Sequence, residues 1–145
     1  MNYILLVSHG TIAEAMHETL KAFFVGDRPD LMYVCLKEGM SPDEFAGQVR
    51  EILADIRAED DLTVLADLMG GSPLTYASCA VSEMGLLERT SFLCGMNLPM
   101  VLELLTGKEH SLRHSGSDEY LQEARNTIRP FSLPPLESLC GAEMI

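Results

Sequence analysis

Short apolar runs alternate along the chain with segments that carry helix signals. The apolar runs cover residues 3–7, 31–36, 62–66 and 91–94. Runs of this length are typical of strands, and a strand that is apolar at successive positions is buried on both faces. Buried strands that are separated by helices predict a parallel sheet with helices on both sides.

The segments between these runs begin in the way that helices usually begin. Helices are predicted over residues 11–24, 41–57, 72–84, 97–107 and 117–126. Thr11 and Glu14 have the spacing of a capping box, and Ser41 followed by Pro42 is typical of a helix start. Four strand–helix units are too few for a closed barrel. We therefore expect an α/β fold, a doubly wound open sheet of four parallel strands in the order 2-1-3-4.

The C-terminal part of the chain has weaker signals. Residues 127–132 are a candidate for a last, antiparallel strand. Pro130 cannot donate a hydrogen bond to a neighbouring strand, which would place this strand at an edge of the sheet. We expect one domain over residues 1–132 and a tail over residues 133–145.

Composition narrows the class of protein. The chain has 145 residues, of which 47% are hydrophobic and 22% charged, enough for one domain with a core. The net charge of -12 argues against binding to nucleic acid or to a membrane surface, both of which need a basic face. The first apolar run is too short for a signal peptide or a spanning helix, and the four cysteines are widely spaced. A cytoplasmic location is therefore expected.

A histidine and a carboxylate follow two strands that should be neighbours. Residues 4–11 read ILLVSHGT, so His9 stands where the first strand stops, and Asp67 follows the third strand. In the order 2-1-3-4, the carboxyl ends of strands 1 and 3 meet at the switch point of the sheet, where ligands bind in such folds. A carboxylate behind a histidine fixes one ring nitrogen as a donor and leaves the other as a nucleophile or base.

The loop after the third strand, DLMGGSP at residues 67–73, has the composition of an anion site. Gly70 and Gly71 allow a tight turn with exposed amides, and Ser72 before Pro73 is a good N-cap for a helix whose N-terminus attracts anions. Each feature alone also fits an ordinary turn or cap. Together with His9 they predict a histidine that accepts and passes on a phosphoryl group. Three residues of the loops at this edge are candidates for a partner-facing surface: Met69, Met96 and Asn97.

The other histidines have weaker patterns. His17 falls inside a predicted helix and is expected at the surface or at the boundary of the core. His110 and His114 have a spacing that can bind a metal on a helix, but no acidic residue stands between them. We expect no metal site.

Three motifs, SHG at residues 8–10, DLMGGSP at residues 67–73 and GMNLPMVLE at residues 95–103, carry a family resemblance. Over roughly residues 1–130 the chain resembles the IIA domain of the mannose-type (mannose, fructose, sorbose) sugar phosphotransferase system. The resemblance implies that His9 accepts a phosphoryl group on Nε2 from the carrier HPr. The group then passes to a histidine of the IIB component, which phosphorylates the sugar that enters through the membrane components IIC and IID.

The same resemblance assigns further roles. Asp67 would orient the His9 ring, and Ser72 would lie near the phosphate. No metal or organic cofactor is implied. Family members are homodimers that exchange a C-terminal antiparallel edge strand, for which residues 127–132 are the candidate. Met69 replaces an aromatic residue that is common before GGSP.

Four alternatives share parts of this pattern. Histidine phosphatases have an arginine before the histidine, where this chain has Ser8, and tetrapyrrole chelatases need another histidine, which is absent between His17 and His110. The phosphotransfer subunit of dihydroxyacetone kinase is similar, but its loop after the third strand is not a GGSP loop. A regulatory IIA-like module would use the same chemistry at His9 with a different recipient, and the sequence leaves that possibility open.

Overall fold

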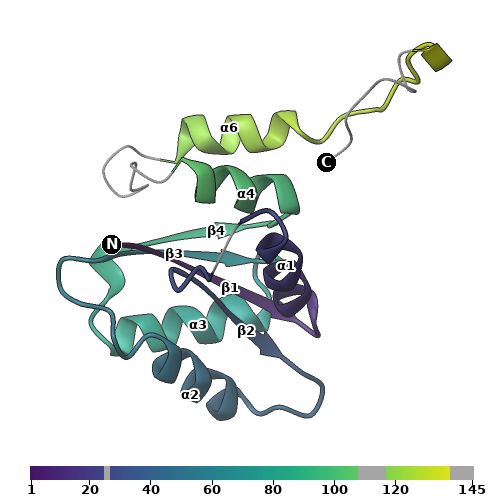
Figure 1. The fold of residues 1–145 in the computed structure, drawn as a ribbon. Coiled ribbons are helices and arrows are strands. Elements are labelled where there is room, and N and C mark those ends of the chain that lie inside the picture. The colour runs from purple at the N-terminus through teal and green to yellow at the C-terminus, as the bar shows by residue number, and fades with distance from the viewer. Residues whose placement is uncertain (25–26, 108–116, 138–145) are drawn as a thin grey trace.

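A parallel sheet of four strands forms the centre of the protein (Figure 1). The computed structural model describes residues 1–24, 27–107 and 117–137. The strands are β1 (Asn2–His9), β2 (Leu31–Leu36), β3 (Asp61–Ala66) and β4 (Thr90–Cys94), in the order β2-β1-β3-β4. This confirms the predicted strand order 2-1-3-4.

Helices cover both faces of the sheet, as predicted. They are α1 (Ile12–Lys21), α2 (Pro42–Ile52), α3 (Ser72–Glu83), α4 (Leu98–Thr106) and α6 (Asp118–Asn126), with a short 3₁₀ turn η1 (Leu87–Arg89) before β4. Figure 1 shows α2 and α3 on one face and α1 and α4 on the other, with α6 lying outside α4. The first two helices end several residues before their predicted ends, because the chain turns at residues 22–23 and 53–55.

The side chains of the strands pack into two hydrophobic cores, one on each face of the sheet. In β1, Leu5 and Val7 pack with the residues of α2 and α3, while Ile4 and Leu6 pack with those of α1 and α4. Side chains that alternate between the two faces of a fully buried strand explain why this run is apolar at every position.

The strand register brings the ends of β1 and β3 together. Val7 is paired with Ala66, and His9 is paired with Leu36 of β2 on the other side. The Asp67 amide donates to the Val7 carbonyl at 3.3 Å, so Asp67 directly follows the paired part of the sheet. The two residues predicted to meet at the switch point therefore leave adjacent strands at the same edge.

The segment after α6 leaves the body of the protein (Figure 1). Four apolar side chains along it are 73% to 80% exposed: Ile128, Phe131, Leu133 and Leu136. The expected strand over residues 127–132 is not formed within the single chain, since the segment projects away from the sheet instead of pairing with it. Its exchange between two subunits remains a prediction.

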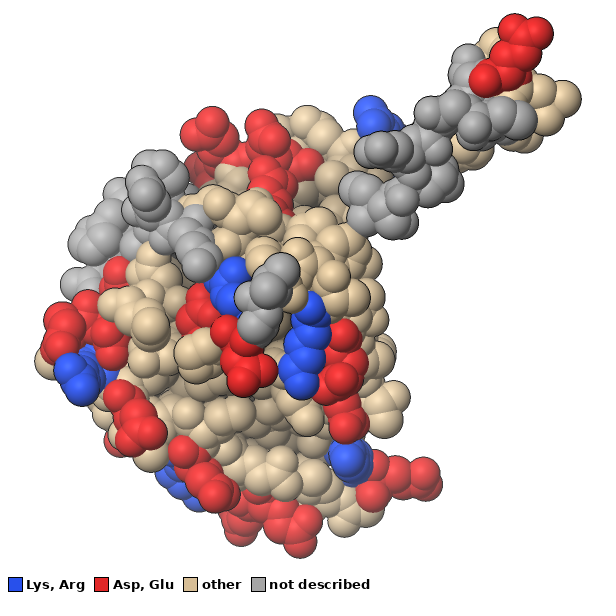
Figure 2. Space-filling view, viewed as in Figure 1, with Lys and Arg blue, Asp and Glu red and all other residues tan. Residues whose placement is uncertain are grey.

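Figure 2 shows acidic side chains spread over the visible face, with basic side chains lying among them, in keeping with a net charge of -12. Within residues 1–24, 27–107 and 117–137, no helix has the length and apolar character needed to cross a membrane.

Candidate functional site

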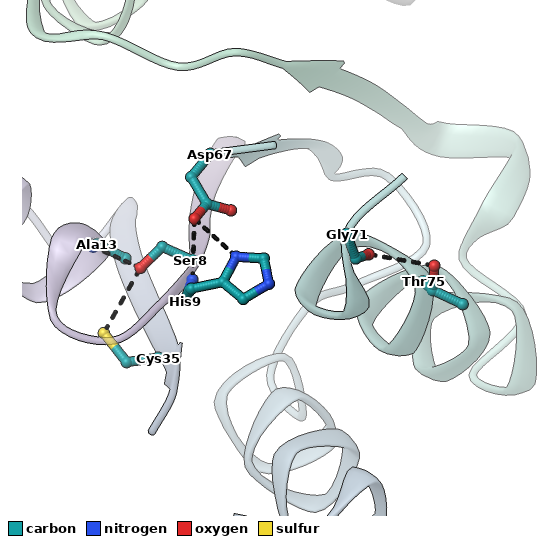
Figure 3. A network of polar contacts seen from close by, with 7 residues as sticks. All are labelled: Ser8, His9, Ala13, Cys35, Asp67, Gly71 and Thr75. Atoms are coloured by element: carbon teal, nitrogen blue, oxygen red, sulfur yellow. Dashed lines mark hydrogen bonds and ion pairs between the residues drawn. The ribbon is translucent and has the colours of Figure 1, made fainter. Parts of the chain in front are cut away.

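His9 and Asp67 form a direct contact at the switch point of the sheet (Figure 3). His9 Nδ1 lies 2.9 Å from Asp67 Oδ2, and the backbone amide of His9 donates to the same oxygen at 3.0 Å. A carboxylate can only accept, so Nδ1 carries the proton and the neutral ring keeps a lone pair on Nε2. The His9 side chain is 45% exposed and that of Asp67 only 12%, so the ring is accessible while the carboxylate is shielded.

Among the described residues, the carboxylate of Asp67 bonds to His9 alone. Both hydrogen bonds from His9 converge on Oδ2, and the second oxygen, Oδ1, is buried with no hydrogen-bond partner in the described part of the chain. A buried carboxylate oxygen without a donor is uncommon, and such groups occur at functional sites. The arrangement serves the orientation of one imidazole ring.

The N-terminus of α3 lies beside the His9 ring and receives no cap from the side chains that the structure describes. In α2 and α4, the side chains of Ser41 and Asn97 accept a first-turn amide, at 3.1 Å and 2.9 Å. In α3 the N-cap is Gly71, with φ -75° and ψ 161°, and no side chain takes that place. Ser72 was predicted as the N-cap of this helix, but it is the first residue of the helix instead. The positive end of this helix is left open toward an anion.

The two glycines of the loop have different roles in the backbone. Gly70 has φ 74°, a left-handed conformation that favours glycine, and it turns the chain toward α3. The Gly71 amide donates to the Leu68 carbonyl at 3.3 Å, and the Gly71 carbonyl accepts from the amide and hydroxyl of Thr75. The Gly71 amide is thus used inside the loop and is not exposed, although the sequence predicted that it would be. Because Pro73 has no amide hydrogen, Ser72 and Leu74 supply the first-turn amides that follow Gly71.

Ser8 has a structural role beside His9 that the sequence pattern did not predict. Its buried hydroxyl oxygen accepts the Ala13 amide at 2.7 Å and lies 4.0 Å from Cys35 Sγ. The predicted capping box at Thr11 is wrong, because Thr11 makes no side-chain cap and Ser8 supplies the acceptor instead. The alternation of side chains along a strand points Ser8 and His9 to opposite faces, and this is the sequence feature that separates the two residues.

The three candidate partner-facing residues differ in exposure. Met69 is 77% exposed, and two more apolar side chains close to His9 or Asp67 in sequence, Leu68 and Ile12, are 58% and 48% exposed. We call Ile12, Leu68 and Met69 the apolar rim. The prediction that Met96 faces a partner is wrong. Its amide bonds to the Ala66 carbonyl, and its side chain is buried in the core at 8% exposure. Asn97 is half-buried, and its side chain caps α4.

The remaining histidines lie away from this site or outside the described residues. His17 Nε2 lies 3.2 Å from the Leu31 carbonyl, and its ring packs on Tyr33, which fits a residue at the boundary of the core. His110 and His114 fall outside the described ranges. In those ranges no group of three or more histidine, cysteine and acidic side chains is placed to hold a metal ion.

The described residues form an open parallel sheet with an oriented histidine at its switch point and the N-terminus of α3 beside that ring. The model of one protein family, the PTS system fructose IIA component, matches residues 3–121. The chain therefore belongs to the mannose/fructose-type IIA family of the sugar phosphotransferase system, as its motifs predicted.

A curated relative agrees with this assignment, and solved structures share the fold. The chain is 28% identical over 107 residues to the PTS system fructose-specific EIIA component of Bacillus subtilis (strain 168), covering 74% of this chain and 70% of that protein. Its fold is similar to that of the mannose/sorbose-specific IIA subunit from Enterococcus faecalis, with a TM-score of 0.75 and 22% identity over 93% of this chain and 98% of the other. It is also similar to a sigma-54 interaction domain protein from Enterococcus faecalis, with a TM-score of 0.68 and 17% identity over 88% and 96% of the two chains.

Proposed function

We propose that His9 accepts a phosphoryl group from phospho-HPr and passes it to a histidine of a IIB component. The observation that carries this proposal is the 2.9 Å contact between His9 Nδ1 and Asp67 Oδ2, which leaves Nε2 free beside the open N-terminus of α3. A neutral ring with its lone pair on Nε2 is the form of histidine that can attack phosphorus.

The transfer is a displacement at phosphorus between two imidazole rings. The bond between phosphorus and the donor nitrogen breaks as the bond between phosphorus and His9 Nε2 forms, and the leaving nitrogen keeps the electron pair. Nδ1 of His9 keeps its proton, and the Asp67 carboxylate balances the positive charge that the ring gains. Phosphoryl transfer depends mainly on positioning and on charge stabilisation, and both are supplied here by fixed groups.

The start of α3 is the proposed site for the phosphoryl oxygens. The Gly70–Gly71 turn delivers the chain to the helix, and the first-turn amides together with the Ser72 hydroxyl are the proposed donors. Removal of the hydroxyl in Ser72→Ala should cost about 1–3 kcal/mol of transition-state stabilisation if one charge-assisted hydrogen bond is lost.

The apolar rim is the proposed contact for both protein partners. Ile12, Leu68 and Met69 are exposed apolar side chains that follow His9 or Asp67 closely in the sequence, and such residues are favoured at the centre of protein interfaces. Because HPr and IIB must each present a histidine to the same Nε2, they would use this surface in turn.

We further propose a cytoplasmic homodimer. The described cysteines, Cys35, Cys79 and Cys94, are free thiols, as in a reducing compartment. The apolar segment after α6 projects from the body, and β4 pairs on one side only in the described part of the chain. An exchanged strand from a second copy would cover both surfaces.

One alternative recipient has an observation in its favour. The fold similarity to a sigma-54 interaction domain protein suggests a regulatory module that would report phosphorylation to a transcription factor. The chemistry at His9 would be the same. Transfer of phosphate from the phosphorylated protein to a purified IIB component would support a role in transport. Failure of that transfer would favour the regulatory module.

The decisive experiment is phosphorylation by phosphoenolpyruvate, enzyme I and HPr, read by intact mass. The wild type should gain one acid-labile phosphate and His9→Ala none. Absence of phosphate on the wild type, with a competent control IIA present, would contradict the proposed function.

A further inference from the structure

The His9 ring lies directly against the backbone of Gly71. A Cβ atom added to Gly71 would lie 2.8 Å from Cε1 of His9 and 3.6 Å from Nε2. The nearest atom outside the ring is the Leu68 carbonyl oxygen, at an ordinary contact distance of 3.4 Å. The imidazole ring is therefore the one group near Gly71 that a side chain would displace.

The backbone of Gly71 does not itself require glycine. Its φ of -75° and ψ of 161° are extended values that any residue adopts. The neighbouring Gly70 is the reverse case, since it has φ 74° and nothing within 4 Å of an added Cβ. Gly70 is needed for the turn, whereas Gly71 is needed for the space beside it.

The ring cannot give way without losing its partner. His9 Nδ1 is held 2.9 Å from Asp67 Oδ2, and Cε1, the ring carbon bonded to Nδ1, faces Gly71. A methyl group at position 71 would rotate the ring away from the carboxylate. It would also crowd Nε2 on the side of α3, where the phosphoryl oxygens are proposed to bind.

We propose that Gly71 is a positioning residue for phosphoryl transfer: its missing Cβ lets His9 keep Nδ1 on Asp67 while Nε2 faces the start of α3. The proposal rests on the proposed function of His9 and adds to it the residue that sets the ring. Gly71 acts through His9 and not on the phosphate, because its amide is bonded to Leu68 within the loop.

The first test combines a ring signal with a rate. In Gly71→Ala, the ¹⁵N and ¹H NMR signals of the unphosphorylated His9 ring should shift, and the Nδ1–H proton should exchange faster with water. Phosphorylation by phospho-HPr should slow by about 100-fold, the loss that a misplacement of about 1 Å produces. Gly47→Ala is the matched control, since Gly47 lies in α2 with nothing within 4 Å of an added Cβ. It should leave the ring signals and the rate unchanged.

The second test uses stability and needs no phosphoryl donor. Gly71→Ala should lower the melting temperature in the wild-type background and not in the His9→Ala background, where the ring is absent. Gly70→Ala should lower it equally in both backgrounds, because its cost is the strained φ. If Gly71→Ala alone fails to fold, the double variant with His9→Ala should still fold.

The outcomes separate this inference from the proposed function. Wild-type ring signals, a wild-type rate, or an equal loss of stability in both backgrounds would overturn the role of Gly71. A wild-type protein that takes no phosphate from phospho-HPr would contradict the proposed function, and Gly71 would then have no role in phosphoryl transfer. The ring signals and the stability cycle would still show whether Gly71 sets the position of His9.

Discussion

Ser8 Oγ lies 2.7 Å from the backbone nitrogen of Ala13, so the residue before His9 caps the helix after it. The bond fixes the end of β1 to the first turn of α1 and holds the turn from which the His9 ring projects. Ser8 is fully buried, so water cannot replace the hydroxyl if it is removed.

Ser8→Ala should therefore destabilise the protein by about 1–3 kcal/mol, the cost of leaving a buried amide without an acceptor. Urea denaturation at equilibrium measures this change. Ser78→Ala is the matched control, because Ser78 Oγ donates to the Leu74 carbonyl within the same helix and its loss leaves no buried amide unpaired. Equal losses of unfolding free energy in the two variants would show that the Ser8 cap stabilises the protein no more than an ordinary helix hydroxyl does.

Asp67→Asn should slow phosphorylation of His9 by about 10²–10⁴-fold with little change in stability. The amide oxygen can take the place of Oδ2 and accept both bonds from His9, while the amide nitrogen takes the place of the unpartnered Oδ1. The geometry is kept and the charge is lost. The rate of phosphate transfer from phospho-HPr, measured beside a denaturation curve, tests the two halves of this prediction. A wild-type rate would remove the charge of Asp67 from the mechanism.

The pairing of His9 with Asp67 could be predicted from the sequence because it follows from topology. Once the strand order is known, the ends of β1 and β3 must meet, whatever the loops do. The cap by Ser8 and the burial of Met96 could not be predicted in this way. Each depends on how a loop folds back on the sheet: the Met96 amide reaches the Ala66 carbonyl, which no local pattern indicates. The close approach of Gly71 to the ring is likewise visible only in three dimensions.

Glu103 on α4 should make the contact between α4 and α6 sensitive to pH. Burial raises the pKa of the Glu103 carboxyl, and the charge and hydrogen bond of Glu123 on α6 raise it further. The pKa of the neighbouring Tyr120 hydroxyl, which donates to the Met100 carbonyl, is also raised, first by burial and then by Glu103. A folded-state pKa above the unfolded value gives stability that is present below the unfolded pKa and lost as the pH rises through the folded pKa.

Glu103→Gln should consequently raise the melting temperature at neutral pH, and this gain should shrink as the pH falls toward the pKa of a free glutamate. Melting curves at several pH values measure both effects. Glu119→Gln serves as the control, because Glu119 is an exposed acid in the first turn of α6 that favours the helix dipole. That variant should show no such gain at neutral pH. A Glu103→Gln protein with an unchanged melting temperature at all pH values would contradict the prediction.

The apolar segment after α6 should hold the proposed dimer together. Phe131 is 80% exposed in the single chain, and an exchanged strand would bury it against the partner subunit. Phe131→Asp should therefore convert a dimer into a monomer at micromolar concentration, because a buried, unpaired charge is strongly unfavourable. Sedimentation equilibrium measures the mass, and Ser132→Asp, which places the same charge on the opposite face of the predicted strand, should weaken the dimer much less. A monomeric wild type would refute the homodimer. A Phe131→Asp protein that remains dimeric would instead place the interface elsewhere on the molecule.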